Sequence, residues 1–95
     1  MNKLQEYRQE IEQIDHELYG LISKRLEICS KIGDYKKENN LPIFDAKREE
    51  ELKEKNLLAV EEKYRHACGE VLELILKLSK DFQLWRPIVE MTSSI

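Results

Sequence analysis

Three groups of polar residues, far apart along the chain, carry side chains suited to chemistry. Arg25 and Lys36 share one face of a long helical segment, because eleven residues turn about three full circles, and lie roughly 16 Å apart along its axis. The other two groups, Asp45-x-x-Arg48-Glu49 and Ser79-x-x-x-Gln83, follow later in the chain. Several cations, one or two carboxylates and two neutral hydrogen-bonding groups suit a small polyanion that carries a hydroxyl, since arginine binds carboxylates through a two-pronged fork.

The two later groups also have an ordinary structural interpretation. Charge at the start of a helix is typical of a solvated face, and a polar pair beside an apolar stripe is typical of an interface. Other catalytic patterns are missing: His16 and His66 have no partners at metal-ligand spacing, and the chain has no GxSxG, glycine-rich phosphate loop or HExxH. We therefore expect no metal and no cofactor.

One long helix is expected to position the first group. Apolar residues recur there at alternating steps of four and three, which is the spacing of a buried seam, interrupted by Arg25. The helix would be roughly 55 Å long, against a diameter near 30 Å for a compact domain of this size. We therefore expect a second copy of the chain to cover it. The seam consists of Leu4, Tyr7, Ile11, Ile14, Leu18, Leu21, Ile28, Ile32 and Tyr35.

Arg8 lies on a similar face of this helix, but about 25 Å from Arg25 and about 42 Å from Lys36. It cannot join their site within one chain. It can join the equivalent site of an antiparallel partner.

Two shorter helices are expected after a break at Asn39-Asn40-Leu41-Pro42, where the proline biases Leu41 away from helix and the asparagines favour a turn. Asp45 has the position of an N-cap. The pattern thus predicts an all-α protein, a single domain of residues 1–95 with helices at about 2–39, 46–60 and 65–86 and a loosely packed tail at 87–95. The third helix carries an apolar stripe of Cys68, Val71, Ile75, Leu78, Phe82 and Trp85, widened by Leu72, Leu74, Leu76 and Leu84.

The composition limits the partners and the compartment. Charged residues are 37% of the 95, yet the net charge is only −3, which argues against nucleic acid or a membrane surface as the partner. No run approaches transmembrane length, and the first residues have no apolar signal core. Cys29 and Cys68 have neither a CxxC motif nor a histidine cluster, so we expect buried, reduced thiols in a cytoplasmic protein.

Taken together, these residues resemble the all-helical (AroQ-class, type II) chorismate mutases. The resemblance covers most of the chain, from the first helix through Gln83. Any one element is weak, but all of them in this order and with compatible spacing are specific. They are Arg8 with Ile11, Ile14 and Asp15; Leu21 through Arg25; Lys36 followed by Pro42-Ile43-x-Asp45; Arg48-Glu49; and Ser79-x-x-x-Gln83.

The resemblance implies an intertwined homodimer of three-helix chains with two equivalent sites. In each site, Arg25 and the partner's Arg8 would clamp the two carboxylates of chorismate. Arg48 would support this charge network, and Ser79 would contact a carboxylate.

The resemblance also implies the reaction, a Claisen rearrangement of chorismate to prephenate in phenylalanine and tyrosine biosynthesis. Lys36 and Gln83 would donate hydrogen bonds to the ether oxygen of the breaking C–O bond. Glu49, with the backbone near Asp45, would hold the ring hydroxyl. The reaction is unimolecular and needs no nucleophile, metal or general base, so the missing catalytic triads do not argue against an enzyme.

Three alternatives remain open at this point. An isochorismate pyruvate lyase shares the fold and a similar cationic pocket. A ligand-sensing or regulatory domain of the shikimate pathway is the second. A non-catalytic helical dimer is the third, but it explains neither Arg25 within an apolar seam nor the polar pair on the third helix.

Overall fold

A computed structural model describes residues 2–84 of the chain, and in this range it is helical without any strand. The helices are α1 (Lys3–Glu38), α2 (Ala46–Leu58) and α3 (Glu62–Leu84). The predicted all-α class with a very long N-terminal helix is thereby confirmed. The predicted helix end at residue 86 and the tail at 87–95 lie outside the described residues.

The helix ends follow from local hydrogen bonds. The side chain of Asn2 caps α1 by accepting from the backbone N–H of Gln5 at 2.9 Å. After α1, Asn40 adopts a left-handed conformation with φ 56°, which asparagine tolerates better than most residues. Asp45 caps α2, because its Oδ1 accepts from the N–H of Arg48 at 3.0 Å, which confirms the predicted N-cap.

The start of α3 differs from the prediction. The connection from α2 takes only residues 59–61, so α3 begins at Glu62, three residues earlier than expected. The backbone N–H groups of Ala59 and Val60 bond back to the last turn of α2, at 3.3 and 3.2 Å, and close a tight turn. An acidic residue in the first turn, Glu62, then suits the positive end of the helix dipole.

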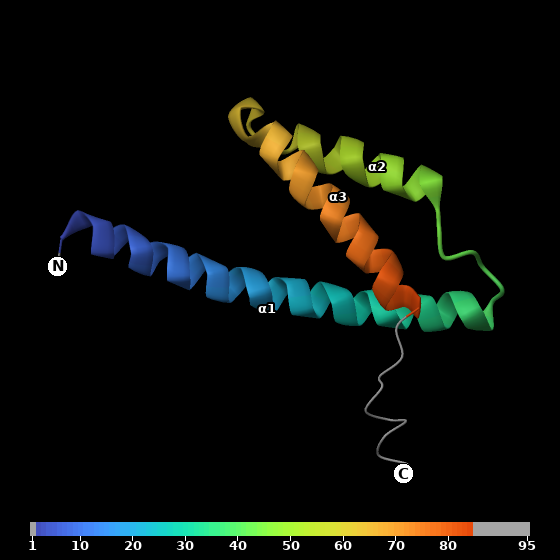
Figure 1. The fold of residues 1–95 in the computed structure, drawn as a ribbon. Helices are drawn as coiled ribbons and strands as arrows, with labels where there is room; N and C mark the ends of the chain where they lie inside the picture. The colour runs from blue at the N-terminus through green and yellow to red at the C-terminus, as the bar shows by residue number, and fades with distance from the viewer. Residues whose placement is uncertain (1, 85–95) are drawn as a thin grey trace, which may run out of the picture.

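The three helices form a flat, open arrangement (Figure 1). From the end of α2, α3 runs back and crosses the C-terminal half of α1, whereas the N-terminal half of α1 extends away from the other helices (Figure 1). Within residues 2–84, α3 packs on both other helices, and α1 and α2 do not pack on each other. The radius of gyration is 17.5 Å, against about 12 Å for a compact domain of this length. The chain therefore has little interior of its own.

The crossing of α1 and α3 depends on Gly33. A Cβ added there would overlap the carbonyl oxygen of Gln83 and lie 2.6 Å from its Cα and carbonyl carbon, so only glycine permits this approach of the two backbones. The buried apolar side chains of the described chain are Cys29 on α1 and Leu72 and Leu76 on α3.

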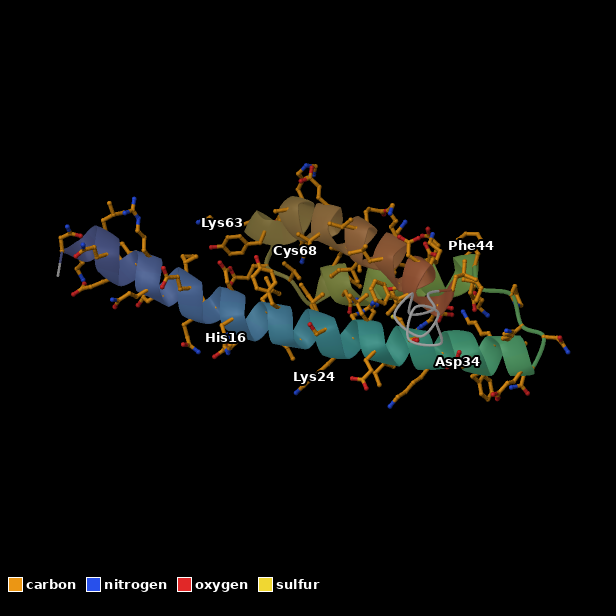
Figure 2. All side chains as sticks on the ribbon, turned by 60° about the horizontal axis from the view of Figure 1, so that its bottom comes forward. His16, Lys24, Asp34, Phe44, Lys63 and Cys68 are labelled. Atoms are coloured by element: carbon orange, nitrogen blue, oxygen red, sulfur yellow. The ribbon has the colours of Figure 1, made fainter. Side chains whose placement is uncertain are left out.

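In a single chain the predicted apolar stripes are only partly buried. In α3 the buried residues include Leu72 and Leu76, whereas Val71 and Leu74, also assigned to the apolar stripe, are 57% and 56% exposed. Trp85, the last member of that stripe, lies outside the described residues. In α1 the predicted seam is 42–63% exposed, because α3 reaches only part of it, near Leu18 and Ile32. Lys24 lies on the opposite side of α1, away from α2 and α3 (Figure 2). A single chain thus leaves much of the seam uncovered.

In the part of the chain that the structure describes, every helix is too short or too polar to cross a bilayer.

Candidate active site

A cavity of about 260 Å³ opens where the C-terminal half of α1, the loop before α2, the start of α2 and the end of α3 meet. Its volume is just below the roughly 300–1,000 Å³ usual for small-molecule sites. Seven of the eight predicted site residues line it: Arg25, Lys36, Asp45, Arg48, Glu49, Ser79 and Gln83. The eighth, Arg8, is exposed near the other end of α1 and takes no part in the cavity of its own chain.

Lys36 and Gln83 form the first polar contact of the cavity wall. The Nζ atom of Lys36 donates to Oε1 of Gln83 at 2.7 Å and to the carbonyl oxygen of Ile43 at 2.9 Å. Gly33 lies one turn before Lys36 and sets the helix crossing that makes this reach possible. Because the oxygen of the buried carboxamide accepts from Lys36, its NH₂ group remains available to a ligand; no hydrogen bond within residues 2–84 uses it.

Arg25 and Ser79 form the second contact, also across α1 and α3. Nη1 of Arg25 donates to the hydroxyl oxygen of Ser79 and lies 3.7 Å from Sγ of Cys29. The hydroxyl of Ser79 donates in turn to the carbonyl oxygen of Ile75 at 2.6 Å. Ser79 therefore holds one edge of the guanidinium. Since a guanidinium carries five N–H donors, others are left for an anion.

The start of α2 supplies the acidic side of the cavity. The carboxylate of Asp45 is used as the helix cap, whereas Oε2 of Glu49 pairs with Nζ of Lys80 at 3.2 Å. The side chain of Arg48 lines the cavity from the same turn of the helix.

Lys80 is the one cavity cation that sequence reasoning missed. It lies three residues before Gln83 on α3, so helical periodicity places both on one face. That spacing was a usable signal. A lysine beside a polar pair, however, is also typical of a solvated surface.

The lining has an excess of positive charge, although the whole chain has a net charge of −3. An excess of positive groups in a concave site attracts an anionic ligand. The arrangement therefore suits a small molecule with more than one carboxylate, neutral donors at the Lys36–Gln83 end and an acceptor at Glu49. The charged lining residues are the cations Arg25, Lys36, Arg48 and Lys80 and the carboxylates Asp45 and Glu49.

Two curated proteins are similar to this chain. A bifunctional chorismate mutase/prephenate dehydratase from Aquifex aeolicus is 33% identical over 93 residues, which cover 88% of this chain and 26% of that protein. The T-protein of Haemophilus influenzae is 43% identical over 49 residues, which cover 52% of this chain and 13% of that protein. The chain thus spans about a quarter of the length of the first relative and less of the second.

A solved structure has the same fold as most of this chain. A conserved hypothetical protein from Pyrococcus furiosus superimposes with a TM-score of 0.72 and 43% sequence identity, covering 87% of this chain and 97% of that one. The family model for chorismate mutase type II matches residues 7–84, which include every one of the eight predicted site residues. The chain belongs to the chorismate mutase type II family.

Proposed function

We propose that this chain catalyses the rearrangement of chorismate to prephenate, a step of phenylalanine and tyrosine biosynthesis. The observation that carries the proposal is the contact between Lys36 and Gln83, 2.7 Å long, in a cavity whose other end holds Arg25. Membership of the chorismate mutase type II family supports it.

The chemical step needs donors at one oxygen atom. The ether C–O bond of chorismate breaks while a C–C bond forms between the enolpyruvyl methylene carbon and the ring, so no atom is gained or lost. Negative charge grows on the ether oxygen as its bond breaks. The ammonium of Lys36 and the amide NH₂ of Gln83 would donate to this oxygen, and one such donor is typically worth on the order of 10²–10³ in rate.

The remaining groups hold the substrate in a reactive shape. Arg25, held by Ser79, would bind one carboxylate, and Arg48 would strengthen the field around it. Glu49 would accept a hydrogen bond from the ring hydroxyl. These contacts would keep the flexible enolpyruvyl arm over the ring. The free substrate adopts this reactive conformation only rarely, whereas the bound substrate would be held in it.

The proposal includes a homodimer. The apolar seam of α1 is 42–63% exposed in one chain, and it adjoins a groove between α1 and α3 lined mainly by aliphatic side chains. A second copy would cover both, and the partner's Arg8 would supply the second carboxylate clamp. Cys29 is buried, as predicted, whereas Cys68 is only partly buried, and both are free thiols, which suits the reducing cytoplasm where we propose that the reaction takes place.

The test is a chorismate-depletion assay with prephenate detected as the product. We expect loss of chorismate with matching formation of prephenate, and loss of this activity in Lys36→Ala. A parallel incubation with isochorismate, assayed for pyruvate, covers the lyase alternative. Stable chorismate in the presence of a folded protein would overturn the proposal, and pyruvate release would replace it by the lyase.

A further inference from the structure

Lys80 joins three segments at the acidic side of the cavity. Its Nζ atom lies 3.2 Å from Oε2 of Glu49 on α2 and 4.9 Å from the ring centroid of Phe44, which precedes the α2 cap. Lys80 itself belongs to α3. Phe44 is labelled at the entry to α2 in Figure 2. One ammonium group therefore contacts the loop and α2 from the helix that forms the opposite wall.

The pair differs from an ordinary surface ion pair. The side chain of Glu49 is 19% exposed and that of Lys80 is 36% exposed, whereas the Lys77–Asp81 pair on the same helix is 67% and 56% exposed. Among the described residues, Lys80 is the one cation paired with Glu49. A flexible carboxylate that lacks a partner would sample several rotamers, and this contact selects one.

The orientation of the carboxylate matters for its use. Oε2 of Glu49 is engaged by Lys80, which leaves Oε1 as the acceptor for a ligand. Since α1 and α2 do not pack on each other within residues 2–84, the distance between Glu49 and the donors of α1 depends on α3 and on the loop before α2, which Lys36 contacts at Ile43. Lys80 is a direct link between α3 and Glu49.

We propose that Lys80 is a positioning residue, which holds the carboxylate of Glu49 where it accepts the hydroxyl of the bound substrate. This role rests on the proposed mutase function. The competing role for Lys80 is direct binding of a substrate carboxylate. The two roles differ in kinetics: misplacement of Glu49 lowers kcat, whereas loss of a uniform binding contact raises KM.

The experiment is a double-mutant cycle on chorismate turnover with Lys80→Met, Glu49→Gln and both together. We expect Lys80→Met to lower kcat/KM about 10-fold, mainly through kcat, which is less than the roughly 10²-fold loss of a 1 Å misplacement. In the Glu49→Gln background the same substitution should have almost no effect, because the group that it positions is already lost. Lys80→Arg should restore most of kcat, since it keeps a cation beside Glu49.

Lys77→Met is the matched control. It removes the same charge from α3, three residues away, but Lys77 does not line the cavity, so kcat and KM should stay at the wild-type values. A cooperative thermal unfolding transition shows that a variant is folded. If Lys80→Met does not fold, Lys80→Gln replaces it in the experiment.

Two results would overturn this role alone: wild-type kcat in Lys80→Met, or an effect of Lys80→Met that is undiminished in the Glu49→Gln background. An effect confined to KM would assign Lys80 to direct substrate binding instead. Absence of turnover in the wild-type chain would overturn the mutase proposal, and this role with it.

Discussion

Replacing Gly33 by alanine should separate α1 from α3 and disable the site without replacing any polar side chain. The new Cβ would overlap the backbone carbonyl oxygen of Gln83 and lie 2.6 Å from its carbonyl carbon and Cα, whereas ordinary contacts begin at 3.4 Å. The helices would therefore have to move apart by about 0.8 Å or more, because backbone atoms cannot rotate out of the way as a side chain can. This shift would pull Gln83 away from Lys36, one turn along α1, and lengthen their 2.7 Å hydrogen bond.

Two opposing energies set the expected change in stability. Alanine gains about 1 kcal/mol over glycine inside a helix. Overpacking at a close contact typically costs about 1–3 kcal/mol. Gly33→Ala should thus range from neutral to about 2 kcal/mol less stable. Gly20→Ala is the matched control in the same helix: no atom of residues 2–84 lies within 4 Å of its new Cβ, so it should gain about 1 kcal/mol. The difference between the two variants then isolates the cost at the crossing.

The expected loss of activity is larger than the loss of stability. A misplacement near 1 Å can cost on the order of 10² in rate, so kcat/KM for chorismate should fall about 100-fold in Gly33→Ala and stay unchanged in Gly20→Ala. Urea unfolding at one fixed chain concentration gives the free energies, since dimer stability depends on concentration. If Gly33→Ala equals Gly20→Ala in both unfolding and turnover, the crossing does not set the site geometry.

Four further predictions test the remaining groups. Arg25→Ala should leave the far-UV circular dichroism spectrum unchanged and lower kcat/KM by on the order of 10²–10³; loss of folding would instead show a structural role. An equal mixture of inactive Arg8→Ala and Lys36→Ala chains should recover about a quarter of wild-type turnover, because half of the dimers each regain one intact site. No recovery after verified subunit exchange would reject the shared site. Turnover should be nearly flat from about pH 6 to pH 8, because no histidine of residues 2–84 lines the cavity; a sharp change there would reveal an essential titrating group. The hydrogen bond to Glu73 raises the pKa of Lys53 above its usual 10.5, so this pair stabilises the fold below that pH and is lost as the pH rises through the raised pKa. The unfolding temperatures of the wild type and Lys53→Met should therefore converge at strongly alkaline pH, and a constant difference would show that the pair does not contribute.

The sequence predicted the helices and most of the cavity because their signals are local. A proline-free stretch with regular apolar spacing indicates a long helix whatever its partners are. Asp45 indicates a helix start because an N-cap requires only its own hydrogen bond to Arg48. Arg25 was recognisable because a cation within an apolar seam is costly unless it has a partner.

The features that were missed depend on contacts between helices. Periodicity shows that α1 has an apolar stripe, but it does not show which face packs on α3. That face carries Cys29 and Gly33, and an isolated glycine gave no sign of a crossing point. Lys80 resembled a surface residue because its partner, Glu49, lies on another helix. The early start of α3 was missed because Glu61 and Glu62 form no recognisable turn signal.

The polar residues buried between α1 and α3 connect the fold to the site. Ser79 and Gln83 are 7% and 8% exposed, positions that leucine would fill in a chain selected only for stability. A buried polar group without a partner typically costs about 1–3 kcal/mol, and here each is satisfied by a cation that also lines the cavity, Arg25 or Lys36. Part of the contact between α1 and α3 thus consists of polar pairs that also line the cavity. The apolar seam of α1 is exposed in a single chain, and in the homodimer that we propose a second copy would cover this seam and, through its Arg8, complete the site.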